Sequence, residues 1–320
     1  MERRQVLKAA AGGVVVVGAS GAAGWGLRGG GPIVDRAGNL ENLDATGVGS
    51  GRAGAFGIRR VIYSVPVDET IASLTFDDGP DPQFTPRVLE ILAGYGIKAT
   101  FNVMGYNAIH HADILMEVVA AGHEIGNHTW SHLDLSTIGV AETAYEIRRG
   151  RQVIEDLTKQ KIRFFRPPRG EMSGLAIRYV AEEGNDILMW SITGSVPGRE
   201  HPKEVNSFVL SKLEPGAIVD FHDGIGRGTF DPTSLGAKGL IARRTAEIEG
   251  LPRLIETAMG RGYEFMTVSE LITHEVPGKL PSMTPDDSPN ADRDEPAVTN
   301  PPDATIPTGT TIAAPDPASS

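Results

Sequence analysis

The sequence between residues 61 and 268 alternates short apolar runs with longer amphipathic segments, and this alternation constrains the fold more than any other feature. Runs rich in Val, Ile and Phe have the length of strands, and most are followed by a segment whose apolar residues recur at helical spacing. Strand–helix repeats of this kind predict a parallel sheet. Seven such units in about 215 residues favour a barrel over an open sheet, although periodicity alone does not separate the two.

The expected elements follow from this pattern. We expect strands at residues 61–67, 71–76, 99–104, 123–127, 162–165, 186–192, 217–221 and 263–268, and helices at 86–95, 112–121, 140–159, 174–183, 203–213 and 251–259. Residues 225–250 are glycine-rich and are expected to form an insertion that acts as a lid or groove wall.

Four separate segments place polar side chains directly after a predicted strand. They begin at Asp77, His128, Arg166 and His222. In a parallel barrel the carboxyl ends of the strands lie on one rim, where the following loops build the site. The sequence therefore predicts that these four segments meet at a single site.

The first two segments carry the residue types of a metal site. Asp77 and Asp78 precede a Gly-Pro turn, and His128 and His132 are spaced by four residues, which predicts both imidazoles on one helical turn. One carboxylate with two histidines suits a divalent cation that keeps an open coordination position. The other carboxylate is then available as a base. Alone, the acidic pair would be a turn cap and the histidines surface residues, but together they predict a metal-dependent hydrolase.

The other two segments can complete such a site. The double proline after Arg166 fixes the backbone, so the segment is either a rigid corner or a support for an arginine aimed at a carboxylate, with a backbone N–H facing an oxyanion. His222 ends a strand and shares a face with Asp220. A histidine at this position is a candidate general acid.

Composition excludes several other classes of function. The formal net charge is −11, with eight acidic and two basic residues in 275–320 alone, and the chain has no block of Lys and Arg. A nucleic-acid partner is therefore not expected. The chain has no cysteine, which excludes disulfides, thiol chemistry and cysteine-bound zinc.

The two ends of the chain differ from the region between them. Residues 1–30 carry Arg3 and Arg4 before an apolar stretch and are expected to be a twin-arginine export signal, the alternative being a retained membrane span. Residues 31–57 are expected to be a flexible linker, 58–274 the catalytic domain, and 275–320 a disordered tail rich in Pro, Thr and Asp. We expect an exported, extracytoplasmic monomer that meets a membrane only through an uncleaved N-terminal segment.

The four segments, in this order, resemble the polysaccharide deacetylase family (carbohydrate esterase family four) over about residues 61–271. The resemblance implies a distorted (β/α)7 barrel and metal-dependent removal of N-acetyl groups from sugar polymers. It also implies a role for each motif residue. Asp78, His128 and His132 would bind the metal, expected to be Zn²⁺, Asp77 would be the base oriented by Arg166, the Arg169 N–H would face the oxyanion, and His222 would be the acid.

Three positions depart from the family pattern. Arg169 stands where a tyrosine is usual, Asp220 stands where an apolar residue lines the acetyl pocket, and the segment 191–197 after Trp190 lacks the acid that normally sets the charge of the histidine. We expect Trp190, Arg169 and Asp220 on the substrate side of the site. Our hypothesis is that Asp220 pairs with His222 or with Arg169.

Two alternatives remain at this point. The same chemistry can act on another amide or on an ester, and the polar pocket can favour a different acyl group. The second alternative is a non-catalytic glycan-binding protein on the same fold. The glycan itself, whether peptidoglycan, chitin or another acetylated polymer, is not specified by the sequence.

Overall fold

The computed structural model describes residues 60–195, 198–226 and 235–280. In this part of the chain one sheet runs in the order β1-β6-β5-β4-β3-β2-β8-β7, and β9 pairs with β2. All of the pairings between these strands are parallel. The strands are β1 (Val61–Ile62), β2 (Ile71–Asp77), β3 (Thr100–Val103), β4 (Glu124–Asn127), β5 (Phe164–Phe165), β6 (Asp186–Leu188), β7 (Ile192–Thr193), β8 (Ile218–His222) and β9 (Glu264–Phe265).

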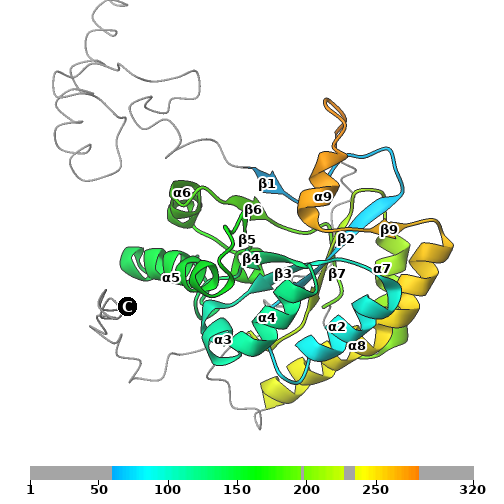
Figure 1. The fold of residues 1–320 in the computed structure, drawn as a ribbon, viewed down its shortest axis with the longest axis horizontal. Helices are drawn as coiled ribbons and strands as arrows, with labels where there is room; N and C mark the ends of the chain where they lie inside the picture. The colour runs from blue at the N-terminus through cyan, green and yellow to red at the C-terminus, as the bar shows by residue number, and fades with distance from the viewer. Residues whose placement is uncertain (1–59, 196–197, 227–234, 281–320) are drawn as a thin grey trace, which may run out of the picture.

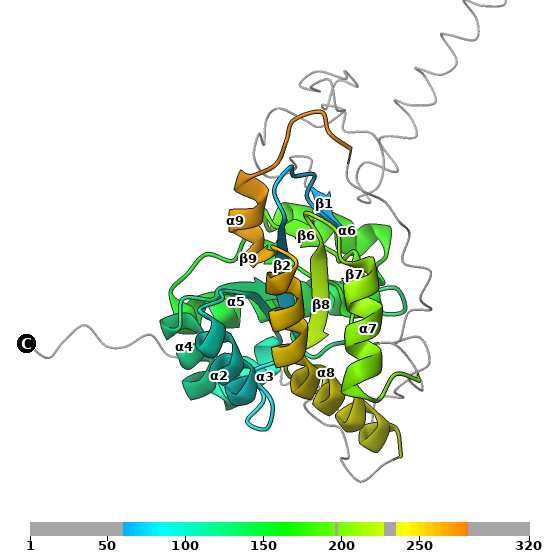
Figure 2. The ribbon, with the colours of Figure 1, turned by 90° about the vertical axis from the view of Figure 1, so that its right-hand side faces the viewer.

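Helices cover the outside of the curled sheet (Figures 1 and 2). They are α2 (Thr85–Tyr95), α3 (Gly105–His110), α4 (Ala112–Ala120), α5 (Val140–Thr158), α6 (Gly174–Glu182), α7 (Pro202–Lys212), α8 (Leu235–Gly260) and α9 (Val268–Thr273). The result is a parallel half-barrel, which confirms the expected distorted (β/α)7 barrel.

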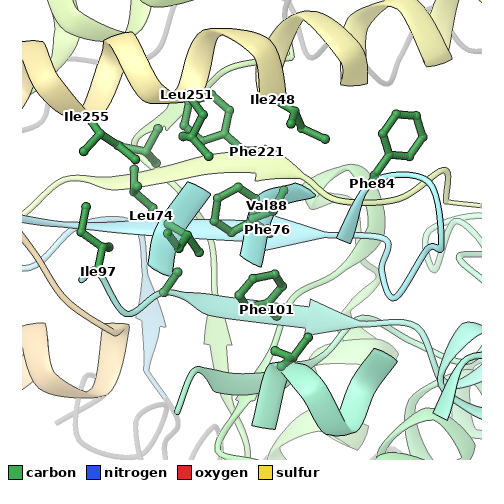
Figure 3. Packing of buried hydrophobic residues seen from close by; sticks show 14 of the residues in the cluster. Leu74, Phe76, Phe84, Val88, Ile97, Phe101, Phe221, Ile248, Leu251 and Ile255 are labelled. Carbon is green, nitrogen blue, oxygen red and sulfur yellow. The ribbon is translucent and has the colours of Figure 1, made fainter. Parts of the chain in front are cut away.

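Alternation along the two central strands separates core from site. In β2, Leu74 and Phe76 pack in the main hydrophobic cluster, and in β8 Val219 and Phe221 do the same. Phe76 stacks between Phe101 and Phe221, and the cluster extends to apolar residues of α8 (Figure 3). Because successive side chains of a strand point to opposite faces, the polar residues between these apolar ones point into the half-barrel. Core packing thereby fixes where the site side chains emerge.

Helix α8 corrects the prediction for residues 225–250. That segment was expected to be a lid or groove wall, but residues 235–250 are the first part of a helix that continues through Pro252. The apolar residues Leu240, Ala246, Ile248 and Leu251 are buried along it, so tertiary packing outweighs the glycines that suggested an insertion and the proline inside the helix. The remainder of the predicted insertion, 227–234, lies outside the described residues.

Several strand and helix limits also differ from prediction. The expected strand 61–67 is a strand only at 61–62, followed by an isolated antiparallel bridge between Ser64 and Ala217. The expected strand 186–192 is split into β6 and β7, and 263–268 contains a two-residue strand before the start of α9. Helix α3 was not predicted, since its six residues are too few for a periodic pattern to appear.

The described structure continues past residue 274, to residue 280. Glu275 pairs with Arg60 at 2.9 Å and Lys279 with Asp68 at 2.8 Å. The expected signal segment, linker and most of the tail lie outside the described residues. Among the described helices there is none with the length and apolar character needed to span a bilayer.

Candidate active site

The carboxyl end of β2 places two carboxylates at the centre of the rim. The register sets Asp77 beside Asn102 of β3 and beside His222 of β8. Asp78 follows with a left-handed backbone, φ 77°, and its carbonyl accepts a hydrogen bond from Asn107 Nδ2 at 2.7 Å. Left-handed backbone at a non-glycine residue is strained and concentrates at functional positions. The two adjacent side chains therefore enter the site in different directions.

A tight turn after these carboxylates depends on Gly79. Its N–H donates to Asp223 Oδ1 at 3.2 Å, and a Cβ on Gly79 would lie 2.2 Å from Asp223 Oδ2. Only glycine fits this approach. The predicted turn is thus held by a carboxylate from the segment after β8.

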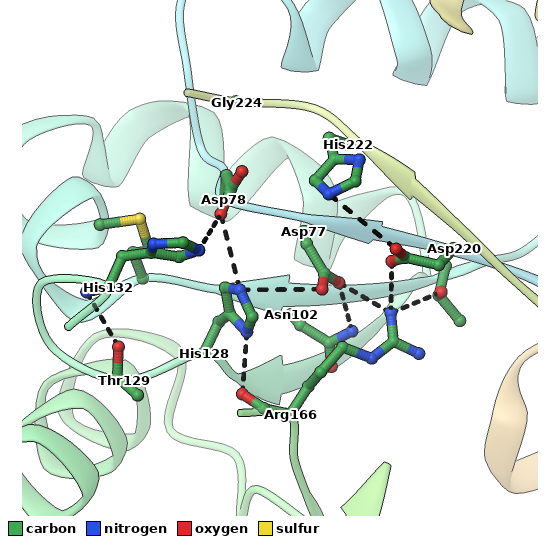
Figure 4. A network of polar contacts seen from close by, with 12 residues as sticks. Asp77, Asp78, Asn102, His128, Thr129, His132, Arg166, Asp220, His222 and Gly224 are labelled. Atoms are coloured by element: carbon green, nitrogen blue, oxygen red, sulfur yellow. Dashed lines mark hydrogen bonds and ion pairs between the residues drawn. The ribbon is translucent and has the colours of Figure 1, made fainter. Parts of the chain in front are cut away.

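Asp78, His128 and His132 form a buried cluster. One ligand atom from each lies within 4.8 Å of the others. Asp78 Oδ1 is 3.5 Å from His128 Nε2 and 3.2 Å from His132 Nε2 (Figure 4). These three residues are the ones expected to bind the metal.

The two histidines do not share a helical turn, contrary to the prediction from their spacing. They lie in the loop after β4, where Thr129 and His132 have φ values of 69° and 64°. The His132 N–H donates to Thr129 Oγ1 at 3.0 Å. This irregular turn, rather than helical periodicity, brings both imidazoles to Asp78.

The cluster fits a divalent cation on three observations. His128 Nδ1 lies 2.8 Å from the Arg166 carbonyl, which can only accept, so the proton sits on Nδ1 and Nε2 presents a lone pair. Asp78 Oδ1 is buried and accepts no hydrogen bond from the described residues. Burial raises the pKa of Asp78, although Arg244 opposes this, and a cation would favour its ionised form.

Asp77 is held in a fixed orientation as an ionised carboxylate. Its Oδ1 accepts from Asn102 Nδ2 at 2.7 Å and from Arg166 Nη1 at 2.8 Å. Its Oδ2 lies on the side of the cluster, 3.7 Å from His128 Nε2. Burial raises the pKa of Asp77, but neighbouring positive charge, above all that of Arg166, outweighs burial and brings the pKa below its ordinary value.

Arg166 is buried and joins three parts of the site. Besides Asp77, its Nη1 donates to Thr75 Oγ1 at 2.7 Å and to Asp220 Oδ1 at 3.0 Å. Its Nε and Nη2 donate to the carbonyls of Leu188 and Met189. The orienting contact expected between Arg166 and Asp77 is therefore present in the structure.

Two of the three residues expected on the substrate side, Asp220 and Trp190, lie against this arginine. Asp220 Oδ2 lies 3.9 Å from His222 Nε2, so Asp220 lies between Arg166 and His222. Trp190 is half-buried, and its ring lies 5.6 Å from the Arg166 guanidinium. Arg169 occupies a 3₁₀ turn, Pro168–Gly170, with φ 60°. Its predicted oxyanion role stays a prediction.

His222 has a carboxylate partner that the sequence did not reveal. Glu247 Oε2, on α8, lies 2.9 Å from the His222 backbone N and 3.2 Å from Nδ1. Burial and Arg244 lower the pKa of His222, but Glu247 and Asp220 outweigh them and raise it to about 10. Arg244 also donates to Asp78 Oδ2 at 3.1 Å.

Comparisons with known proteins agree with the fold. The polysaccharide deacetylase family model matches residues 64–187. A peptidoglycan-N-acetylglucosamine deacetylase of Bacillus cereus is 31% identical over 217 residues, covering 67% of this chain and 94% of that protein. A chitooligosaccharide deacetylase of Bradyrhizobium is 32% identical and covers 68% and 96%. One similar solved structure is that of a mutant, with restored enzymatic activity, of a family-four pseudoenzyme from Bacillus anthracis. The match has a TM-score of 0.58 and 27% sequence identity, and it covers 68% of this chain and 73% of that chain.

Fold and site together define a parallel half-barrel hydrolase with a buried Asp-His-His cluster at the carboxyl ends of its strands. The chain belongs to the polysaccharide deacetylase family, carbohydrate esterase family four.

Proposed function

We propose that this protein is a metal-dependent hydrolase that removes N-acetyl groups from the amino sugars of a polysaccharide. The observation that carries the proposal is the buried Asp78, His128 and His132 cluster next to the separately held carboxylate of Asp77. Relatives named for peptidoglycan N-acetylglucosamine and chitooligosaccharides support an acetylated glycan as the substrate class.

Asp78, His128 and His132 would hold the ion, for which we propose Zn²⁺ because two imidazoles and one carboxylate suit it. When bound, such an ion polarises a carbonyl and lowers the pKa of water. The protein prepares for it by fixing the tautomer of His128 through the Arg166 carbonyl and by directing Asp78 Oδ1 toward both imidazoles.

Asp77 is the proposed base. Asn102 and Arg166 both bond its Oδ1, which leaves Oδ2 on the side of the cluster to accept the proton of an attacking water. Arg166 and Asn102 hold the carboxylate in place, and the lowered pKa keeps it ionised at neutral pH, so that its free Oδ2 is an acceptor.

His222 is the proposed acid for the leaving amine. Its ring is buried, and the strand register places His222 directly beside Asp77. Since its pKa is raised to about 10, it carries a proton to give at neutral pH. We assign the Arg169 N–H to the developing oxyanion, and Trp190 and Asp220 to the wall that meets the acyl group.

We also propose an exported, extracytoplasmic protein. The support is the Arg3-Arg4 pair ahead of an apolar stretch in residues 1–30, with 31–57 as linker, 58–274 as catalytic domain and 275–320 as tail. An acetylated glycan is the proposed partner, and we expect a monomer that meets a membrane only through an uncleaved N-terminal segment.

Acetate release from acetylated chitooligosaccharides and from peptidoglycan fragments tests the proposal, using protein loaded with Zn²⁺ and protein treated with a chelator. We expect release that disappears on chelation and returns with the metal. A folded, metal-loaded protein that binds these glycans without releasing acetate would instead be a non-catalytic glycan-binding protein. Acetate release from simple esters alone would point to another substrate.

A further inference from the structure

The acid that usually sets the charge of the family's histidine is missing from its expected place. Residues 191–197 contain no Asp or Glu. Ser195 instead meets an arginine, since Arg244 Nη1 donates to its Oγ at 2.9 Å. The segment after Trp190 is therefore tied to α8 through Ser195 and offers His222 no carboxylate.

Helix α8 supplies a carboxylate to His222 from another direction. Glu247 Oε2 accepts from the His222 backbone N–H at 2.9 Å and lies 3.2 Å from Nδ1 of the same residue. Both side chains are buried. Because an ionised carboxylate only accepts, the proton must sit on His222 Nδ1. The other ring nitrogen, Nε2, then lies on the side of Asp220, 3.9 Å from its Oδ2, inside the site.

The charges around His222 come from three elements. Asp220 belongs to its own strand, Asp77 and Asp78 come from the end of β2, and Arg244 and Glu247 come from α8. Arg244 lies 3.6 Å from Glu247 Oε1 and 3.1 Å from Asp78 Oδ2, so its positive charge lies between the glutamate and the proposed metal ligand. Burial and Arg244 lower the pKa of His222, but Glu247 and Asp220 outweigh them and raise it to about 10. For Glu247, burial raises the pKa, but His222 and Arg244 outweigh burial and lower it.

We propose that Glu247 is the positioning residue for His222, taking from helix α8 the role that the family pattern gives to an acid after β6. It orients the imidazole through Nδ1, directs Nε2 into the site, and keeps the ring protonated. This inference rests on the proposed function, in which His222 is the acid. It also gives α8 a second part in the site, since Arg244 of the same helix contacts Asp78.

The test compares E247Q and E247D with the matched control E155Q. Glu155 on α5 likewise accepts from a backbone N–H, that of Ile162, and from an arginine, Arg151, and neither partner belongs to the site. We expect E247Q to lower kcat at least tenfold while bound zinc and KM change less than twofold, E247D to lose less than E247Q, and E155Q to keep the wild-type kcat.

An NMR pH titration of the labelled His222 ring, with its signal assigned by comparison with H222Q, measures the protonation of His222 directly. If Glu247 had only a structural role, E247Q would leave this titration unchanged. We expect an imidazolium at pH 8 in the wild-type zinc protein, a titration at least one pH unit lower in E247Q, and no such change in E155Q. A neutral His222 at pH 8 in the wild type would overturn the proposal, and that measurement needs no variant to fold. A wild-type kcat and an unchanged titration in E247Q would also overturn it.

The experiments distinguish a failure of the proposed deacetylase function from a failure of the role assigned to Glu247. If the wild-type protein releases no acetate from any glycan, the proposed function fails, yet the titration still decides whether Glu247 controls the protonation of His222. If acetate is released and only the Glu247 variants behave like wild type, the function stands and the assignment of Glu247 is wrong.

Discussion

The guanidinium of Arg166 lies 2.8 Å from Asp77 Oδ1, and both side chains are buried at the rim of the half-barrel. The arginine also holds Asp220 at 3.0 Å, so one cation compensates two buried carboxylates. Removing one partner of a buried pair leaves an uncompensated charge, whereas changing both together can be nearly neutral. These contacts determine the effects that we expect from substitutions of Asp77, Arg166 and Asp220.

Replacing the proposed base should abolish turnover and leave the cluster intact. The substitution D77N removes the proton acceptor but keeps an amide of the same shape, and Asp77 is not one of the three proposed ligands. We expect kcat to fall about 10²–10⁴-fold, the usual contribution of a positioned base, with bound zinc unchanged. Acetate release and metal content of the same preparation measure both effects. Near-normal activity in D77N would mean that the base is another group.

A double-mutant cycle on Arg166 and Asp220 should show strong coupling. Each single change, R166M or D220N, disturbs a buried ion pair, so we expect an interaction free energy of about 1 kcal/mol or more in denaturant unfolding. Cycles of Asp220 with His222 and with Arg169 test the original hypothesis for the acid at position 220. Additive effects in all three cycles would show that Asp220 has no electrostatic role here.

Gly226 should be required for metal affinity. A Cβ at this position would lie 2.9 Å from Asp78 Oδ1 and 3.0 Å from His132 Cδ2, so G226A must displace the proposed ligands. We expect a weaker zinc affinity by isothermal titration. The matched control is G239A, since an added Cβ in α8 would meet nothing within 4 Å. There we expect unchanged affinity and a stability gain of about 0.5–1 kcal/mol. Wild-type zinc affinity in G226A would contradict this geometry.

His123 should make the fold sensitive to acid. Burial, with a smaller effect from Lys98, lowers its pKa to about 4, and its Nδ1 accepts from the Ala99 N–H at 3.2 Å. In the unfolded chain the pKa is about 6.5, so the unfolded state binds more protons between these values. Stability should therefore fall as pH drops from about 6.5 to about 4, and less steeply in H123Q. Urea unfolding at pH 7 and 4.5 measures both slopes, and identical slopes would contradict the assignment.

The sequence predicted which strand ends would meet, because alternating apolar residues reveal strands and a parallel barrel gathers their carboxyl ends on one rim. It did not predict how His128 and His132 reach Asp78. Their spacing suggested a helix, whereas the structure uses a loop with left-handed residues, which leaves no periodic pattern. Spacing alone could not separate these two cases.

Glu247 and Arg244 escaped prediction for a different reason. The glycines in 225–250 predict an insertion, and an insertion gives its residues no fixed place relative to the rim. An Arg and a Glu three positions apart among buried apolar residues were a usable signal, since that spacing puts both on one helical face. Their contacts with Asp78 and His222 are long-range, and only the packing of α8 against β8 reveals them.

Anomalous diffraction at the zinc absorption edge, from crystals of the zinc-loaded protein, tests the central claim most directly. We expect one strong peak within bonding distance of Asp78 Oδ1, His128 Nε2 and His132 Nε2, and its loss in H128A crystals grown in the same way. A well-ordered structure with these three side chains in place and no peak between them, although zinc was supplied, would contradict the account.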